Sequence, residues 1–153
     1  MKSSTLIALN LFVCVVFSSL SAFAAGSDNS VASPSKPAAY HQAQKLIENK
    51  QYDEAVIRLK EAEKASKNDA DIHNLLGFSY RKSGKLAEAA TYYEKALILD
   101  PKHKGALEYQ GELFLMIGDK MAAEKNLEKL EKICWLGCDE LDDLRAAITT
   151  YKP

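Results

Sequence analysis

The sequence lacks the short motifs that most often carry enzyme chemistry. It has no glycine-rich phosphate loop, and no serine or cysteine lies in a recognisable nucleophile motif. The three histidines, His41, His73 and His103, are scattered, and no two of them have metal-ligand spacing. We therefore expect no catalytic residue, no metal site and no cofactor, and the chain is predicted not to be an enzyme.

An excess of charge of either sign is also absent. The chain has 20 Lys and Arg against 21 Asp and Glu, a net charge of −1. Removal of residues 1–24 would take away the single cation Lys2 and leave the balance slightly acidic. Nucleic acids and anionic membrane surfaces are bound through clustered positive charge. Neither is an expected partner.

The sequence has one long apolar run, at residues 6–20. This run is too short to span a bilayer comfortably, because a spanning helix needs ~20 apolar residues. Lys2 precedes the run, and the small residues Ala22 and Ala24 follow it around Phe23. This order is typical of a secretory signal peptide. We predict cleavage after Ala24, a periplasmic or secreted protein, and no membrane insertion after cleavage.

Two other interpretations of residues 1–24 are less favoured. The length of the run and the Ala-Phe-Ala site argue against an uncleaved membrane anchor. A lipoprotein is disfavoured because Cys14 lies inside the apolar run without the small residues of a lipidation site. Residues 25–35, small and polar, are predicted to be a flexible leader. Residues 36–153 then fit one domain.

An internal repeat with a period of about 34 residues organises that domain. Residues one period apart match in size, in these sets: tiny Ala43, Gly77 and Gly111; large Leu46, Tyr80 and Phe114; identical Ala55, Ala89 and Ala123; large Leu59, Tyr93 and Leu127. Tiny residues recur where two helices approach closely, and large ones fill the space beside them. The spacing therefore predicts three helical hairpins.

The period and the middle copy resemble the tetratricopeptide repeat family. The family pattern is matched in the middle copy by Leu76, Gly77, Tyr80, Gly84, Ala89, Tyr93, Ala96, Asp100 and Pro101. The resemblance covers roughly residues 36–137 and implies an all-α solenoid with repeats at 36–69, 70–103 and 104–137. The end copies depart from the pattern, as terminal repeats do.

The expected helices follow from these repeats. Gly84 and Gly118 are predicted to end first helices in a left-handed conformation, and Pro101 separates the second repeat from the third. The helices are expected at about 37–49, 52–65, 70–82, 86–99, 103–117 and 120–134. A capping helix is expected at 139–151, with Asp139 as its N-cap and an apolar stripe of Leu141, Leu144, Ile148 and Tyr151.

Two cysteines, Cys134 and Cys138, remain in the mature chain, where the last repeat meets the capping helix. Cys134 continues the apolar stripe of its helix and is expected to be buried. In an oxidising compartment the pair is predicted to form a disulfide that pins the capping helix to the stack. A redox-active pair and a soft-metal site, for Cu(I) or Zn(II), are the alternatives.

The resemblance also places a partner site. In this family a concave groove is lined by one face of each first helix. Carried onto this chain, that face consists of Tyr40, Gln44 and Ile47, then Asn74, Phe78 and Arg81, then Glu108, Glu112 and Leu115. Its two aromatic residues are expected to be exposed, and Phe78 is the expected anchor because its neighbours already occupy the packing positions. The alternative is a solvated strip with the partner bound elsewhere.

Some family members grip a peptide carboxylate with Lys, Asn and Arg residues. Those places are held here by Tyr40, Gln44, Leu75, Gly105 and Tyr109, so the carboxylate clamp is absent. The resulting hypothesis is an exported, non-enzymatic adaptor or scaffold that holds a peptide or helix of a protein partner. The alternative is a periplasmic thiol- or metal-handling accessory protein acting through Cys134 and Cys138. A third hypothesis is a structural subunit that docks through its first hairpin.

Overall fold

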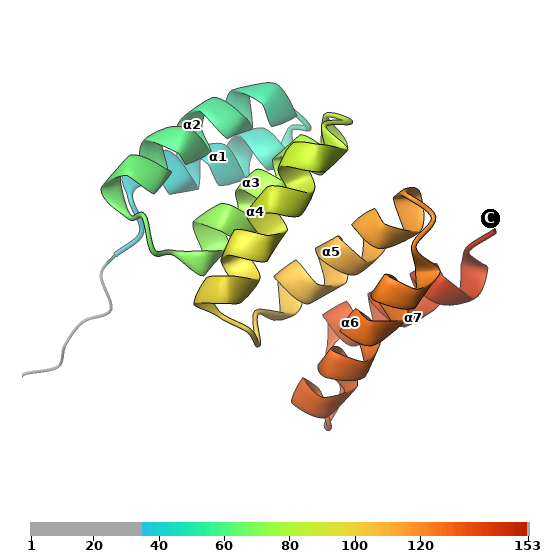
Figure 1. The fold of residues 1–153 in the computed structure, drawn as a ribbon. Helices are drawn as coiled ribbons and strands as arrows, with labels where there is room; N and C mark the ends of the chain where they lie inside the picture. The colour runs from blue at the N-terminus through green and yellow to red at the C-terminus, as the bar shows by residue number, and fades with distance from the viewer. Residues whose placement is uncertain (1–34, 153) are drawn as a thin grey trace, which may run out of the picture. The chain divides into compact units, whose positions relative to one another are not determined.

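The computed structural model describes residues 35–152, which form seven α-helices and, within that range, no strand (Figure 1). The helices are α1 (Ala38–Glu48), α2 (Tyr52–Ala65), α3 (Ala70–Lys82), α4 (Leu86–Leu99), α5 (Lys104–Met116), α6 (Lys120–Ile133) and α7 (Asp139–Thr150). Each end agrees with the expected bounds to within one residue. The predicted signal peptide lies outside the described residues. No helix in the described range has the length and apolar character needed to cross a bilayer.

The three hairpins share one turn geometry. Gly84 and Gly118 have φ angles of +76° and +84°, the left-handed conformation that glycine adopts without steric cost. Lys50, one period before Gly84, adopts φ +59° although it carries a side chain. The predicted glycine turns are confirmed, and the first copy makes the same turn at the cost that a Cβ imposes.

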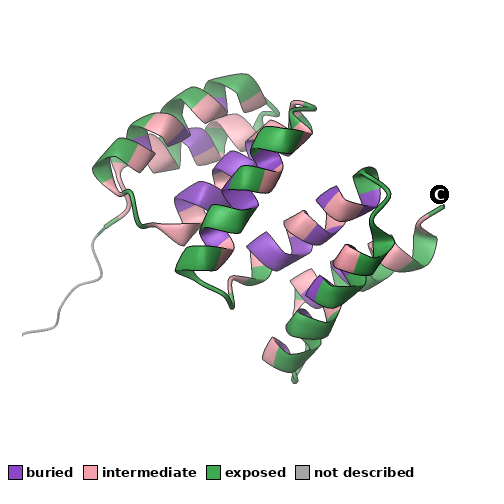
Figure 2. Cartoon of the chain, viewed as in Figure 1, coloured by how far each residue is buried: buried purple, intermediate pink, exposed green. Residues whose placement is uncertain are grey.

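The core consists of three clusters, each of which joins neighbouring helices (Figure 2). Ala43 and Leu59 of the first hairpin pack with Leu76 of the second. Tyr93 of α4 packs with Leu113 of α5. The third cluster contains residues of α5, α6 and α7. Every hairpin therefore buries its apolar face against its neighbour along the chain, as in a solenoid.

The tiny residues at Gly77 and Gly111 allow two different close approaches. A Cβ at Gly77 would lie 2.6 Å from Tyr93 Cδ1, so this glycine faces the second helix of its own hairpin. A Cβ at Gly111 would lie 2.6 Å from Leu144 Cδ1, which belongs to α7. Gly77 and Gly111 are equivalent in the repeat but contact different helices, because α7 packs directly on α5.

The N-cap of the capping helix lies one position earlier than expected. Cys138 is the N-cap residue, with extended backbone and no side-chain hydrogen bond, and Asp139 is the first helical residue. The prediction of Asp139 as N-cap is therefore wrong. Its carboxylate instead joins Glu140 and Asp142 in the first turn, where the helix dipole favours negative charge. Leu141 and Leu144 are buried, as the stripe predicted.

Candidate functional site

The nine predicted partner residues lie on α1, α3 and α5, and we call this surface the first-helix face. The structure gives them unequal exposure. Four are buried, namely Asn74, Arg81, Glu108 and Leu115. The other five are half-buried, namely Tyr40, Gln44, Ile47, Phe78 and Glu112. The expectation that both aromatics stand exposed is wrong, because each packs against neighbouring side chains.

Phe78 lies between two tyrosines from neighbouring helices. Its ring centroid is 6.1 Å from that of Tyr52, the first residue of α2, and 5.0 Å from that of Tyr109 on α5. The Arg81 guanidinium carbon lies 5.6 Å from the centroids of both Phe78 and Tyr109. These aromatic and cation–π contacts tie α3 to α2 and α5. Phe78 thus packs against its neighbours and is half-buried, and the Lys82 Nζ atom lies 5.4 Å from its ring centroid.

Arg81 is the cation at the centre of this face. Its Nη2 atom forms an ion pair with Glu112 Oε2 at 2.5 Å, and its Nε–H donates to the Tyr93 hydroxyl at 3.2 Å. Only 7% of Arg81 is exposed, so its charge is held in a partly dehydrated place by a carboxylate and a hydroxyl. The pair links α3 to α5 and fixes the guanidinium against the aromatic rings.

Glu108, in contrast to Arg81, is a buried ionisable side chain without such a partner within residues 35–152. It is 7% exposed, and no hydrogen bond to its carboxyl group is formed by the described residues. The pKa of Glu108 is raised to about 8, mainly by burial. The carboxylates of Glu112, Asp143 and Glu140 also raise this pKa, and the guanidinium of Arg81 lowers it by a smaller amount. A carboxyl group held in this way keeps its proton near neutral pH.

The N-terminal ends of three helices meet at one end of the face. A pocket of about 290 Å³ there is lined by residues that include Asp71 of α3, Gly105 of α5 and Glu140 of α7. Asn74 lies beside Gly105, at 3.2 Å from where a Cβ would stand, and its Oδ1 atom has no hydrogen-bond partner among the described residues. The unpaired amide oxygen of Asn74 is thus buried near this end and does not line the pocket.

Residues outside the predicted nine contribute to the same face. Tyr52 and Tyr109 enclose Phe78, and Glu140 and Asp143 of α7 act on Glu108. A sequence signal existed for Tyr109, because it stands one repeat period after Leu75 and is adjacent to Glu108. No such signal existed for the α7 carboxylates, because the repeat does not say how a capping helix lies on α5.

The histidines have separate local roles. His103 caps α5, with Nδ1 accepting from the Ala106 N–H at 3.1 Å and Nε2 at 2.9 Å from Asp71 Oδ1. His41 lies 3.1 Å from Gln44 Oε1 on the same helix. Within residues 35–152 no three His, Cys, Asp or Glu side chains are arranged to hold a metal ion.

Cys134 and Cys138 are joined by a disulfide, with their Cα atoms 5.7 Å apart. Cys134 is buried in the cluster that contains Leu130, Leu141 and Leu144, and Cys138 packs against the same cluster. The bond therefore connects the end of α6 to the start of α7 beside the apolar contacts that hold the cap.

We predict that this bond acts as a structural staple. Replacing both cysteines by serine should lower the stability by roughly 2 kcal/mol, because a short cross-linked loop restricts the unfolded chain. Thermal unfolding of the oxidised and double-serine proteins measures the difference. Without reductant, an alkylating agent should leave the wild-type cysteines unmodified. Rapid alkylation, or stoichiometric copper or zinc in the purified protein, would instead support the thiol- or metal-handling alternative.

Comparison with known proteins agrees with this architecture. Residues 70–103 match the tetratricopeptide repeat model. The second TPR domain of human RPAP3, solved in complex with an HSP70 peptide, is 17% identical with a TM-score of 0.65, covering 73% of this chain and 92% of that one. No curated protein sequence matches the chain.

Two bacterial structures are similar as well. The Yersinia enterocolitica type III secretion chaperone SycD, in complex with a peptide of the translocator YopD, is 18% identical with a TM-score of 0.66, covering 80% of this chain and 93% of that one. MamA from Desulfovibrio magneticus RS-1 is 25% identical with a TM-score of 0.60, covering 62% of this chain and 54% of that one. Together with the match at residues 70–103, these likenesses show that the chain folds as an all-α solenoid of the tetratricopeptide type.

Proposed function

We propose that this protein is an exported, non-enzymatic adaptor that holds a peptide or helix of a protein partner on its first-helix face. The observation that carries the proposal is the centre of that face, where Phe78 and Tyr109 are half-buried beside the fixed guanidinium of Arg81. Aromatic and arginine side chains in such places dominate the binding energy of many interfaces. The similar structures of RPAP3 and SycD were solved with bound peptides, which supports the same use here.

The mode of binding follows from the preorganised side chains. Arg81 is already neutralised by Glu112 and oriented by Tyr93, so little conformational entropy is lost when a partner contacts it. The half-buried ring of Phe78 adds an apolar contact next to that cation. The family's carboxylate clamp is missing, so the partner is expected to differ from peptides that are gripped by their C-terminal carboxylate.

Replacement of Phe78 by alanine tests the binding surface. We expect affinity for a partner captured from a periplasmic extract to fall by roughly 1–2 kcal/mol or more, as for hot-spot residues. The melting temperature should fall only modestly, because the lost contacts with Tyr52 and Tyr109 lie at the edge of the core. Isothermal titration with the purified partner and thermal unfolding supply the two numbers.

Ile57→Ala is the matched control. Ile57 is an exposed apolar residue of α2 that lies outside the first-helix face, so this change should affect neither quantity. If Phe78→Ala lowers the melting temperature like a core deletion, Phe78 serves packing and the proposal loses its anchor. If it changes neither affinity nor stability, the partner binds elsewhere.

Export is part of the proposal and has its own test. The charged start, apolar run and Ala22-Phe23-Ala24 site predict that protein secreted through its own signal begins at Ala25. N-terminal sequencing and intact mass of the protein from the periplasm or medium measure this. An exported soluble form that keeps residues 1–24, or a chain found only in the cytoplasm, would contradict it.

A further inference from the structure

The loop closed by the disulfide presents two large apolar side chains to solvent. Trp135 is 79% exposed and Leu136 is 80% exposed, and we call residues 134–138 the Trp–Leu loop. Because the disulfide joins both ends of this loop, its residues have little conformational freedom to lose on binding. Exposed tryptophan and leucine on a constrained loop point to an interaction surface rather than to the core.

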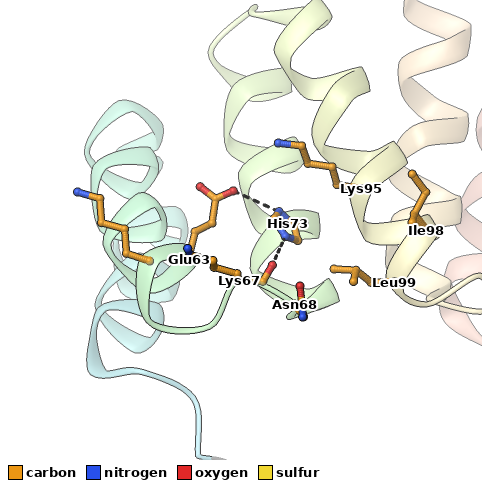
Figure 3. A pocket seen from close by; sticks show the side chains of 8 residues that line it. Glu63, Lys67, Asn68, His73, Lys95, Ile98 and Leu99 are labelled. Carbon is orange, nitrogen blue, oxygen red and sulfur yellow. Dashed lines mark hydrogen bonds and ion pairs between the residues drawn. The ribbon is translucent and has the colours of Figure 1, made fainter.

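A pocket of about 440 Å³ lies between the ends of α2 and α4 (Figure 3). We call it the α2–α4 pocket. Ile98 and Leu99 form an apolar wall, and Lys64, Lys67 and Lys95 line the pocket as well. It lies where second helices end, as the Trp–Leu loop does at the end of α6. Its volume falls within the roughly 300–1,000 Å³ of typical ligand sites.

His73 forms the buried side of the pocket. The side chain is 5% exposed, and its Nε2–H donates to the Lys67 carbonyl oxygen at 2.9 Å (Figure 3). Its Nδ1 atom is buried as well and lies 3.6 Å from Glu63 Oε1. The pocket therefore offers the apolar wall of Ile98 and Leu99 beside lysine side chains, and a large apolar group such as an indole ring suits it.

The charges around the two features are complementary. Lys64, Lys67 and Lys95 form no ion pair with any residue in the described range, and Glu63 is the one carboxylate that lines the pocket with them. Residues 131–145, around the Trp–Leu loop, carry five carboxylates against two cations, Lys132 and Arg145, and Arg145 forms ion pairs with Glu131 and Asp142. Opposite charge steers association and fixes its register.

We propose that the mature chain forms a two-fold homodimer in which the Trp–Leu loop of each copy inserts into the α2–α4 pocket of the other. Trp135 is 79% exposed in the single chain, so it does not occupy the pocket of its own chain. Two-fold pairing makes the same contact twice. A buried tryptophan covers about 150–250 Å², so the contact is small beside a stable interface of roughly 1,200–2,000 Å². The dimer is accordingly weak and concentration-dependent.

Trp135 is the only tryptophan of the chain, so its fluorescence reports directly on insertion. With the disulfide-intact protein from residue 25 onward, sedimentation velocity should show a monomer–dimer equilibrium, and the emission maximum should move to shorter wavelength over the same concentrations. Leu136→Ala should raise the dimer Kd at least about tenfold. Trp135→Ala should do the same, and it is measured by sedimentation because the variant has no tryptophan fluorescence. Met121→Ala, a change at an exposed residue of α6 outside both features, should not. A protein that stays monomeric, or a dimer unaffected by Trp135→Ala, overturns the proposal.

A charge exchange tests the pairing itself. The pocket variant Lys64→Glu/Lys67→Glu/Lys95→Glu and the loop variant Asp139→Lys/Asp142→Lys should each be monomeric, because each then repels its own kind. An equimolar mixture should form a heterodimer with two favourable contacts. The lysine-bearing loop of one variant meets the glutamate-bearing pocket of the other, and the unaltered acidic loop meets the unaltered lysine pocket. Circular dichroism verifies that both variants stay folded. Self-association of either variant at wild-type strength, or a mixture that remains monomeric, contradicts the two-fold arrangement.

Discussion

Leucine in place of Gly77 should unfold the domain or lower its stability strongly. Even the Cβ of an alanine would lie 2.6 Å from Cδ1 and Cε1 of Tyr93, whose ring is fully buried between α3 and α4. The ring has no free space to enter, so the helices must separate. Overpacking of this kind costs ~1–3 kcal/mol or more, a large part of the ~5–15 kcal/mol that stabilises a typical domain. Chemical denaturation of Gly77→Ala and Gly77→Leu measures the loss, which should grow with side-chain size.

Gly105→Ala is the matched control for that series. A Cβ at this position would approach the Asn74 amide nitrogen at 3.2 Å, a longer approach than the 2.6 Å at Gly77 and one made to the end of a side chain. The gain in helix propensity is worth up to about 1 kcal/mol, so Gly105→Ala should be close to neutral. If Gly77→Leu were equally neutral, the close approach of α3 and α4 would not be a requirement of the fold.

Loss of stability between pH 5 and pH 8 is expected from Glu108. Its pKa is about 8 in the folded protein against the ordinary value of 4.5, so the unfolded chain releases this proton at lower pH than the folded one. The contribution of Glu108 to stability is therefore fully present below pH 4.5 and is lost as the pH rises toward 8. The slope approaches roughly 1.4 kcal/mol per pH unit at most.

Glu108→Gln should remove this slope, because glutamine has no proton to lose. At pH 8 the variant should melt at a higher temperature than the wild type, and the two curves should converge toward pH 5. Glu128→Gln, at a position on α6 away from the first-helix face, serves as the control and should keep the wild-type pH dependence. A wild-type stability that rises from pH 5 to pH 8, or a slope that persists in Glu108→Gln, would contradict the assignment.

The helices of the described range and their order followed from the sequence because they depend on interactions close along the chain. The repeat period located each hairpin, and glycines such as Gly84 and Gly118 marked the turns. In a solenoid each hairpin contacts mainly its neighbours, so local patterns carry most of the architecture. The exposure of each side chain within the first-helix face did not follow in the same way. Tyr40 and Phe78 were expected to be exposed and are half-buried.

The sequence by itself therefore determined that this protein is a helical repeat and where its helices begin and end. Only the tertiary structure decided what its functional surfaces contain. Phe78 packs between Tyr52 and Tyr109 because α2 and α5 both approach α3. The pKa of Glu108 is raised by its burial, and then by the carboxylate of Glu112 on α5 and those of Asp143 and Glu140 on α7. Such contacts join residues without a fixed spacing in the chain, and their energies depend on burial, which arises only when the helices stack.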